Sequence, residues 1–306
     1  MKKFICKISI FLGPFIVFLT MSVLFLPENS YDLAIIDKHR ALANIDGQKL
    51  VLVGGSNIAF GIDSEAIQNK FHLPVFNMGV DASFGLGRML DDVLPFLHSG
   101  DYLLVIPEYT HFTSTWNGES NAYLLIFDAR RFRLLFSSCY ELPKGFPEYS
   151  AKHLILFFAR IAGINLENPL AYTRDGFNKY GDYVKHLGLE NRAFDVRPFV
   201  GILNKTYLNN FFKLVDILDS NGITVILTYP NYDEQSFHNS SNFINELDIS
   251  LRTKEKLQVI SMPKDYCFPT SLFFDTAYHL NLEGRALRTD LLIRDLQNAG
   301  IIFLRQ

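Results

Sequence analysis

The feature that most restricts the fold of this chain is a series of short apolar runs separated by helix-forming stretches. The runs are rich in valine, leucine and isoleucine, the pattern of strands buried on both faces of a parallel sheet. They predict strands at residues 49–53, 73–77, 101–106, 223–229 and 257–261. The stretches around them predict helices at residues 31–47, 63–70, 84–97, 205–220, 241–255 and 282–298. Alternating strands and helices joined by right-handed crossovers form a three-layer α/β/α sandwich with a mostly parallel, five-stranded sheet.

Residues 110–200 interrupt this alternation within a domain that we expect to span residues 31–306. The segment is rich in aromatic side chains: Trp116, Tyr123, Phe127, Phe132, Phe136, Tyr140, Phe146 and Tyr149. We expect a mostly helical insertion packed over one side of the sheet. Such an insertion either lines a ligand site at the carboxyl ends of the strands or only extends the hydrophobic core.

The N-terminal residues 1–30 have a different composition from the rest of the chain. Three lysines precede an apolar stretch from about Ile8 to Leu26, and no charged residue occurs between Lys7 and Glu28. This length is close to the ~20 residues that span a bilayer as a helix. We expect an uncleaved transmembrane anchor because no small-x-small cleavage site follows, with a cleaved signal peptide and a buried core helix as alternatives. The lysines place the N-terminus in the cytoplasm and the remainder of the chain outside.

Charge and cysteine content argue against several classes of function. The formal net charge is −3, without a block of like charges, so nothing indicates nucleic-acid binding. The chain has no Cys-x-x-Cys motif and no His/Cys cluster, so neither a metal nor a cofactor is expected. Three cysteines fit either an oxidising or a reducing compartment; Cys6 precedes the apolar stretch, so Cys139 and Cys267 are the candidate disulfide pair if the domain lies in an oxidising one.

The first predicted strand ends in a glycine-rich turn that carries Ser56, in the sequence KLVLVGGSNIAFGIDSEAI (49–67). Ligand sites of parallel sheets lie at the carboxyl ends of strands, and the two glycines let the backbone approach a ligand closely. The turn does not match G-x-S-x-G, the phosphate-binding P-loop or G-x-G-x-x-G. Taken alone, such a serine is more often an ordinary turn residue than a nucleophile.

A second feature precedes the last predicted helix, which has Asn281 as N-cap candidate and Gly300 just past its end. Within FFDTAYHLNLEG (273–284), Asp275 and His279 stand four residues apart. In a helical turn these positions share one side, so the carboxylate reaches one imidazole nitrogen. That contact fixes the tautomer and leaves the other nitrogen for a nucleophile, as Ser–His–Asp catalysis requires. A pair of this kind that stands alone is more often structural.

Taken together, three short blocks resemble the SGNH/GDSL hydrolase superfamily. They are GGSN (54–57), NMGV (77–80) and DTAYHLN (275–281). The resemblance covers about residues 48–106 and 220–298, and it is specific mainly through the order and positions of the blocks. With the expected anchor, the chain is most similar to membrane-anchored extracytoplasmic members linked to O-acetylation or D-alanylation of cell-surface polymers.

The resemblance implies an SGNH-like, flavodoxin-like fold and assigns roles to individual residues. Ser56 matches the nucleophile, and His279 and Asp275 match the other members of the triad. Gly79 matches the glycine that contributes an oxyanion-hole amide after the second strand.

The chain departs from the family pattern in three places. The first block has G-G-S in place of G-D-S, and Asp275 and His279 are separated by three residues where two are usual. The third block, G-x-N-D, is absent after the strand at 101–106, where IPEYTHF (106–112) stands. The asparagine that would complete the oxyanion hole is therefore missing. The loss of one such donor lowers the rate by about 10²–10³-fold.

Side chains around the missing third block are candidates for binding roles. Tyr109 in that segment, or Asn57 next to Ser56, would donate to an oxyanion, whereas an ionised Glu108 would repel one. Substrate contacts are expected from residues that follow two of the predicted strands: Glu108, His111, Asn231 and Tyr232.

The resemblance implies an extracytoplasmic serine esterase or O-acyltransferase that acts on acyl esters, above all acetyl esters, of a cell-surface polysaccharide. With water as acceptor the reaction is deacylation, and with a sugar hydroxyl it is transfer, for which a membrane acyl-transfer protein is a candidate partner. The protein would be a single-pass protein of the bacterial inner membrane with its domain in the periplasm or outside the cell. The alternative is a non-catalytic component of a surface-polysaccharide assembly system that kept the fold, as the missing asparagine suggests.

Overall fold

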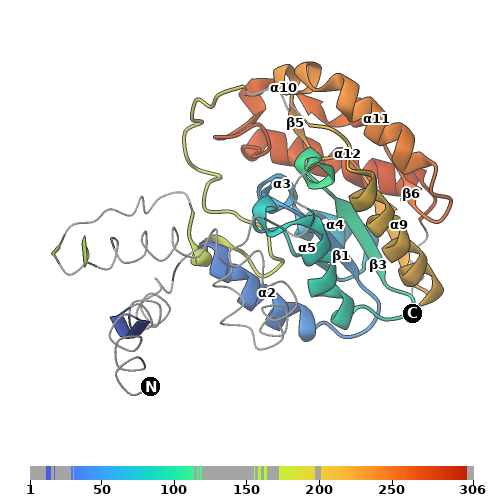
Figure 1. Ribbon diagram of the computed structural model, residues 1–306, viewed down its shortest axis with the longest axis horizontal. Helices are drawn as coiled ribbons and strands as arrows, with labels where there is room; N and C mark the ends of the chain where they lie inside the picture. The colour runs from blue at the N-terminus through green and yellow to red at the C-terminus, as the bar shows by residue number, and fades with distance from the viewer. Residues whose placement is uncertain are drawn as a thin grey trace, which may run out of the picture. The chain divides into compact units, whose positions relative to one another are not determined.

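The computed structural model describes residues 31–113, 172–196 and 201–301, together with a few single positions elsewhere (Figure 1). The expected anchor at 1–30 and most of the expected insertion at 110–200 lie outside the described residues. Of the helices that the structure describes, none combines the length and apolarity that a membrane span requires.

The chain divides into two compact units. One comprises Met1–Leu33 and Glu119–Arg174, and its described part includes a 3₁₀ turn at Tyr31–Leu33. The other comprises Ala34–Gly118 and Asp175–Gln306, and it holds the sheet and every candidate site residue.

The larger unit has an α/β fold with a five-stranded, all-parallel sheet in the order β2-β1-β3-β4-β6. Its strands are β1 (Leu50–Gly54), β2 (Val75–Asn77), β3 (Tyr102–Ile106), β4 (Thr224–Leu227) and β6 (Gln258–Val259). All five predicted strands are therefore present. A second, two-stranded parallel sheet pairs β5 (Tyr232–Asp233) with β7 (Cys267–Phe268), and it was not predicted.

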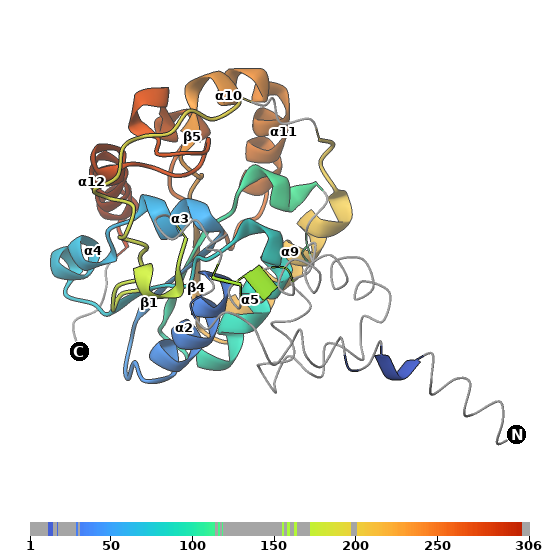
Figure 2. The same ribbon diagram turned by 90° about the vertical axis from the view of Figure 1, so that its left-hand side faces the viewer.

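The helices of this unit are α2 (Ala34–Ala43), α3 (Ser56–Gly61), α4 (Ser64–Phe71), α5 (Leu86–Val93), α9 (Lys205–Ser220), α10 (Glu234–Asn239), α11 (Ser241–Arg252) and α12 (Leu282–Asn298). On one face of the sheet, apolar side chains of α3, α4 and α12 pack against alternate strand residues such as Leu52 and Leu104. Because side chains alternate along a strand, Val51 and Val53 point to the opposite face. There α5 contacts β1 and α9 contacts β4 (Figure 2). Helices on both faces are consistent with the predicted sandwich.

The ends of α12 are those predicted from the sequence. The Asn281 side chain caps the helix by accepting a hydrogen bond from the Gly284 amide at 3.0 Å. Gly300 follows the end of the helix with a φ of +65°, a conformation that glycine adopts without strain.

The strand order places two loops side by side at one edge of the sheet. From β1 the chain leads to β2 on one side, and it then returns past β1 to form β3 on the other side. Open α/β sheets bind ligands at such a reversal, outside the carboxyl ends of the strands. Gly54 pairs with Ile106 in the parallel register, so the residues that follow β1 and β3 lie together at this edge.

Candidate active site at the carboxyl ends of β1 and β3

Ser56 is the first residue of α3, a short helix that begins directly after β1. Gly54 and Gly55 make this close approach possible. A methyl group on Gly54 would overlap the carbonyl oxygen of Ile106, and one on Gly55 would overlap the carboxyl group of Glu108. The two glycines therefore bring Ser56 against the loop that follows β3.

Glu108 lies directly beside the predicted nucleophile. The Ser56 hydroxyl donates to Glu108 Oε1 at 3.3 Å, and the Asn57 amide donates to the same oxygen at 3.2 Å. The glutamate is only 5% exposed. Burial raises the pKa of Glu108 to about 7, and the negative charge of Asp81 acts in the same direction, while the two hydrogen bonds oppose them. The carboxyl group is therefore substantially protonated at neutral pH.

His111 holds the loop that carries Glu108. Its Nδ1 accepts a hydrogen bond from the Glu108 amide at 3.0 Å, so Nε2 carries the proton and donates to the Ala82 carbonyl at 3.1 Å. The side chain is fully buried, and burial lowers the pKa of His111 to about 4. Both ring nitrogens are occupied by the backbone, so a substrate contact by His111 would require these bonds to break.

Asp275 and His279 are joined by the hydrogen bond that their spacing suggested. The distance from His279 Nδ1 to Asp275 Oδ1 is 2.8 Å. Because a carboxylate only accepts, Nδ1 carries the proton and Nε2 of the neutral ring does not. The contact is made in a tight turn closed by the Phe273–Leu280 bridge, rather than in the helical turn that was predicted. The chain reverses direction in this turn, and the reversal brings the Asp275 and His279 side chains together, as a helical turn would.

The position of Phe60 relates His279 to Ser56. Its ring stacks on the His279 ring with centroids 4.1 Å apart and an angle of 9° between the planes. Phe60 stands four residues after Ser56 on α3, and residues at this spacing share one side of a helix. Ser56 and His279 thus lie on the same side of α3. Among the described residues no hydrogen bond joins them, because the Ser56 hydroxyl is turned toward Glu108.

Two of the predicted oxyanion donors have other partners. The Gly79 amide donates to Asn77 Oδ1 at 2.9 Å, and the Asn57 side chain is buried and donates to the Ile106 carbonyl at 3.2 Å. Oxyanion contacts from these groups would require those bonds to break. The third predicted donor, the Tyr109 hydroxyl, is without a hydrogen-bond partner in the described part of the chain, but Tyr109 is almost fully buried.

Asn231 and Tyr232, predicted substrate contacts, brace the turn that carries His279. Asn231 donates to the Tyr278 carbonyl at 2.5 Å, and the Tyr232 ring stacks on the Tyr278 ring at 4.7 Å. Tyr109 packs edge-on against Tyr232 at 5.3 Å. These side chains are buried in the framework behind the site, so any contact with a substrate would need the turn to open.

A buried polar network beneath the site was not predicted. Lys38 donates to the carbonyls of Asn77, Gly79 and Gly181, and burial lowers the pKa of Lys38 to about 7. Asp182 accepts from the amide and hydroxyl of Ser64 and from the Asn77 side chain. The network joins segments that are far apart in the sequence, so no local sequence pattern could predict it. Phe60 and Tyr278 were missed for a similar reason, since their roles depend on a short helix and a turn that periodicity does not reveal.

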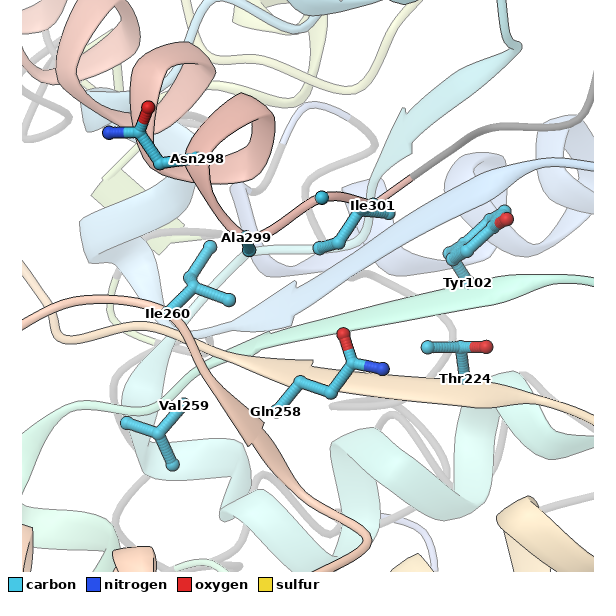
Figure 3. A pocket seen from close by; sticks show the side chains of 9 residues that line it. Tyr102, Thr224, Gln258, Val259, Ile260, Asn298, Ala299 and Ile301 are labelled. Atoms are coloured by element: carbon cyan, nitrogen blue, oxygen red, sulfur yellow. The ribbon is translucent and has the colours of Figure 1, made fainter.

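Two cavities in the described part of the molecule lie away from these residues. The larger, of about 610 Å³, is bordered by Tyr102, Thr224 and Gln258 at the amino-terminal side of the sheet (Figure 3). The other, of about 400 Å³, is bordered by His186 and Asn281. Neither is lined by the candidate catalytic side chains, so the site is defined by side-chain geometry and strand position.

The described residues contain no cluster of three His, Cys, Asp or Glu side chains placed to hold a metal ion. Cys267 is a free thiol, and Cys139, its expected disulfide partner, lies outside the described residues. The described structure therefore gives the expected disulfide no support.

Comparison with models of protein families finds no family that matches this chain, and no curated protein matches it. The resemblance to SGNH hydrolases accordingly depends on the three short blocks and their order. What the structure adds is the placement of Ser56, Glu108, Asp275 and His279 in one region of one α/β unit.

Proposed function

We propose that this chain is a serine-dependent acyl-ester hydrolase or O-acyltransferase of the SGNH type. The observation that carries the proposal is the Asp275–His279 hydrogen bond, which joins His279 Nδ1 to the carboxylate while the imidazole ring stacks on Phe60. Phe60 lies one helical turn from Ser56, and Ser56 stands at the strand reversal where ligands of such sheets bind.

The reaction follows from these positions. Ser56 Oγ attacks the acyl carbonyl carbon and passes its proton to His279 Nε2, while the Asp275 carboxylate stabilises the imidazolium. The tetrahedral intermediate expels the alcohol, which takes the proton back from His279, and an acyl-enzyme remains. Water or a second hydroxyl then attacks the ester of Ser56 by the same route. Before the first attack the Ser56 hydroxyl must turn from Glu108 toward His279, a side-chain rotation of a kind common between free and substrate-bound states.

The proposed substrates are acyl esters, above all acetyl esters, of a cell-surface polysaccharide. This choice is supported by the resemblance of the sequence blocks and by the expected N-terminal anchor, which would hold the domain at the outer face of the membrane. A membrane protein that supplies acyl groups is the partner that the transfer reaction would need.

The proposal is tested with the full-length protein in detergent, a fluorophosphonate probe and p-nitrophenyl acetate. We expect covalent labelling and ester turnover that disappear in Ser56→Ala. Ser220→Ala, which removes an exposed hydroxyl at the end of α9, should leave both unchanged. A folded wild-type protein that neither reacts with the probe nor turns over the ester would refute the enzyme proposal.

One set of observations favours a second candidate, a non-catalytic component of polysaccharide assembly. The Ser56 hydroxyl is hydrogen-bonded to a buried carboxyl group, and the expected oxyanion donors Gly79 and Asn57 have other partners. Under this alternative, the wild-type protein binds the isolated polysaccharide but shows no Ser56-dependent labelling or ester turnover. Isothermal titration calorimetry of the wild type, combined with the assays above, separates the two candidates.

A further inference from the structure

We infer that Glu108 in its protonated form donates a hydrogen bond to the oxyanion of the reaction, in the role that the missing asparagine leaves open. The inference rests on the proposed function, because it needs an acyl carbonyl attacked by Ser56. It assigns to Glu108 direct contact with the reacting oxygen.

The position of Glu108 is set by the sheet. Gly54 of β1 pairs with Ile106 of β3, so Ser56 and Glu108, each two residues further along, meet across the strand reversal. The carboxyl group lies over Gly55, where any larger side chain would displace it. The backbone of Glu108 is held by His111. The carboxyl group is therefore preorganised beside the nucleophile, as a donor to a developing charge must be.

The two oxygens of this carboxyl group have different surroundings. Oε1 accepts hydrogen bonds from the Ser56 hydroxyl and the Asn57 amide. As the N-cap of the 3₁₀ turn at Tyr109–Phe112, the Glu108 side chain also accepts a hydrogen bond from the His111 backbone amide. Because Oε1 already faces two donors, the proton of the acid is assigned to Oε2. That proton is the one proposed to be donated to a substrate oxygen bound in front of Ser56.

The surroundings favour the protonated acid. No lysine or arginine among the described residues forms an ion pair with Glu108, and its titratable neighbours are Asp81, Tyr278 and His111. Asp81 adds negative charge, the Tyr278 hydroxyl is neutral because its pKa lies well above 10, and buried His111 is neutral at pH 7. None of the three supplies the positive charge that would stabilise a carboxylate. A buried carboxylic acid kept neutral in this way can act as an oxyanion donor.

The chemistry balances without any further reactant. As the bond from Ser56 Oγ to the acyl carbon forms, the carbonyl electron pair moves to its oxygen, and the Ser56 proton moves to His279 Nε2. The new oxyanion accepts a hydrogen bond from Glu108 Oε2–H, and Glu108 keeps its proton throughout. When the intermediate collapses, the electron pair returns to the carbonyl and the alcohol leaves with the proton from His279.

The test compares Glu108→Gln and Glu108→Ala with the wild type in full-length protein, using p-nitrophenyl acetate between pH 5.5 and 9. Gln keeps an acceptor for Ser56 and Asn57 and a donor at the Oε2 position, but it cannot ionise. We expect wild-type kcat/KM to fall about tenfold per pH unit above about pH 7. Glu108→Gln should retain activity within about tenfold at pH 6 without that decline, whereas Glu108→Ala should lose about 10²–10³-fold.

Other outcomes overturn the inference in distinguishable ways. If Glu108→Gln is as inactive as Glu108→Ala, Glu108 acts as a base and not as a donor. If the alkaline decline persists in Glu108→Gln, another group causes it. If turnover does not depend on Ser56, the proposed function fails and this inference fails with it.

A second measurement needs no turnover. The infrared carbonyl band of a protonated carboxyl group should be present at pH 6 in Ser56→Ala, titrate away near pH 7, and be absent in the double variant with Glu108→Gln. Absence of this band in Ser56→Ala at pH 6 would show that Glu108 is ionised and would overturn the inference.

Discussion

At the scale of single residues, buried polar side chains of the larger unit form hydrogen bonds with specific partners, and Lys38 is the clearest case. Its ammonium group donates to three backbone carbonyls and lies 4.3 Å from the centre of the Phe177 ring. One side chain thus ties the end of β2 to the loop around Gly181. Since buried acceptors without donors are costly, this residue should matter more to stability than its charge alone suggests.

We predict that Lys38→Met lowers the free energy of unfolding by roughly 2–4 kcal/mol at pH 7, because three buried carbonyls lose their donor. Burial lowers the pKa of Lys38 from 10.5 to about 7, so between these values the unfolded chain binds more protons than the folded chain. Wild-type stability should therefore rise with pH from about 7 toward 10.5, and this component should be absent in the variant. Urea unfolding at pH 7 and 9.5 measures both effects. Lys70→Met, at an exposed position of α4, is the control, and equal stability of the two variants would contradict the prediction.

Asp275 should affect the rate of ester turnover through its hydrogen bond to His279. Asp275→Asn should lower kcat for p-nitrophenyl acetate by about 10²–10⁴-fold with little change in KM, because an amide no longer enforces the His279 tautomer or stabilises its charge. Asp290→Asn, on the exposed side of α12, should have wild-type kinetics. Full activity of Asp275→Asn would remove Asp275 from the proposed triad.

At the scale of elements, α3 depends on the close approach of the loop that follows β2. A Cβ atom on Gly79 would lie 2.7 Å from the Gly55 carbonyl oxygen and 3.0 Å from the Ala59 amide nitrogen. Backbone atoms cannot move aside as a flexible side chain does. Gly79 is therefore needed for packing, whatever the role of its amide.

We expect Gly79→Ala to destabilise the protein by about 1–3 kcal/mol through overpacking against α3. Gly188→Ala is the matched control, since a Cβ atom there would have no neighbour within 4 Å and the backbone is not left-handed. Thermal unfolding followed by circular dichroism compares the two. If Gly79→Ala and Gly188→Ala have equal melting temperatures, the loop after β2 moves to accommodate the added methyl group and the prediction is wrong.

Elements with a strong repeating pattern were predictable, and the exceptions have physical causes. The helix at 205–220 and the helix at 282–298 occur at the predicted residues. The helix predicted at 84–97 is broken into three pieces, because Gly85 adopts a φ of +78° and Pro95 cannot donate the next helical hydrogen bond. Six residues of α3 and two each of β5 and β7 are too few for a period to be visible.

At the scale of the whole molecule, the class of fold followed from the sequence, whereas part of the site did not. The four-residue spacing of Asp275 and His279 in the sequence predicted the contact between them. The contact between Ser56 and Glu108 depends on the pairing of β1 with β3, strands whose residues are 52 positions apart. The same holds for the network of Lys38 and Asp182, which only the assembled sheet and its loops bring together.

The expected orientation in the membrane is also a property of the whole chain. We predict that alkaline phosphatase fused to the C-terminus is active in cells, because the enzyme folds only outside the cytoplasm and the N-terminal lysines stay inside. Replacing those three lysines with glutamate should reduce the activity of the fusion. An inactive fusion that accumulates to normal levels would place the domain in the cytoplasm.

The stacking of Phe60 on His279 should shift the proton signals of this histidine in solution. Protons above the face of a phenyl ring are shielded by its ring current, and the two rings here are nearly parallel at 4.1 Å. The imidazole C2 proton of His279 should therefore resonate upfield of the signals from exposed histidines such as His238. A one-dimensional spectrum would then separate the histidines stacked on aromatic rings from the exposed ones, without a label and without a substrate.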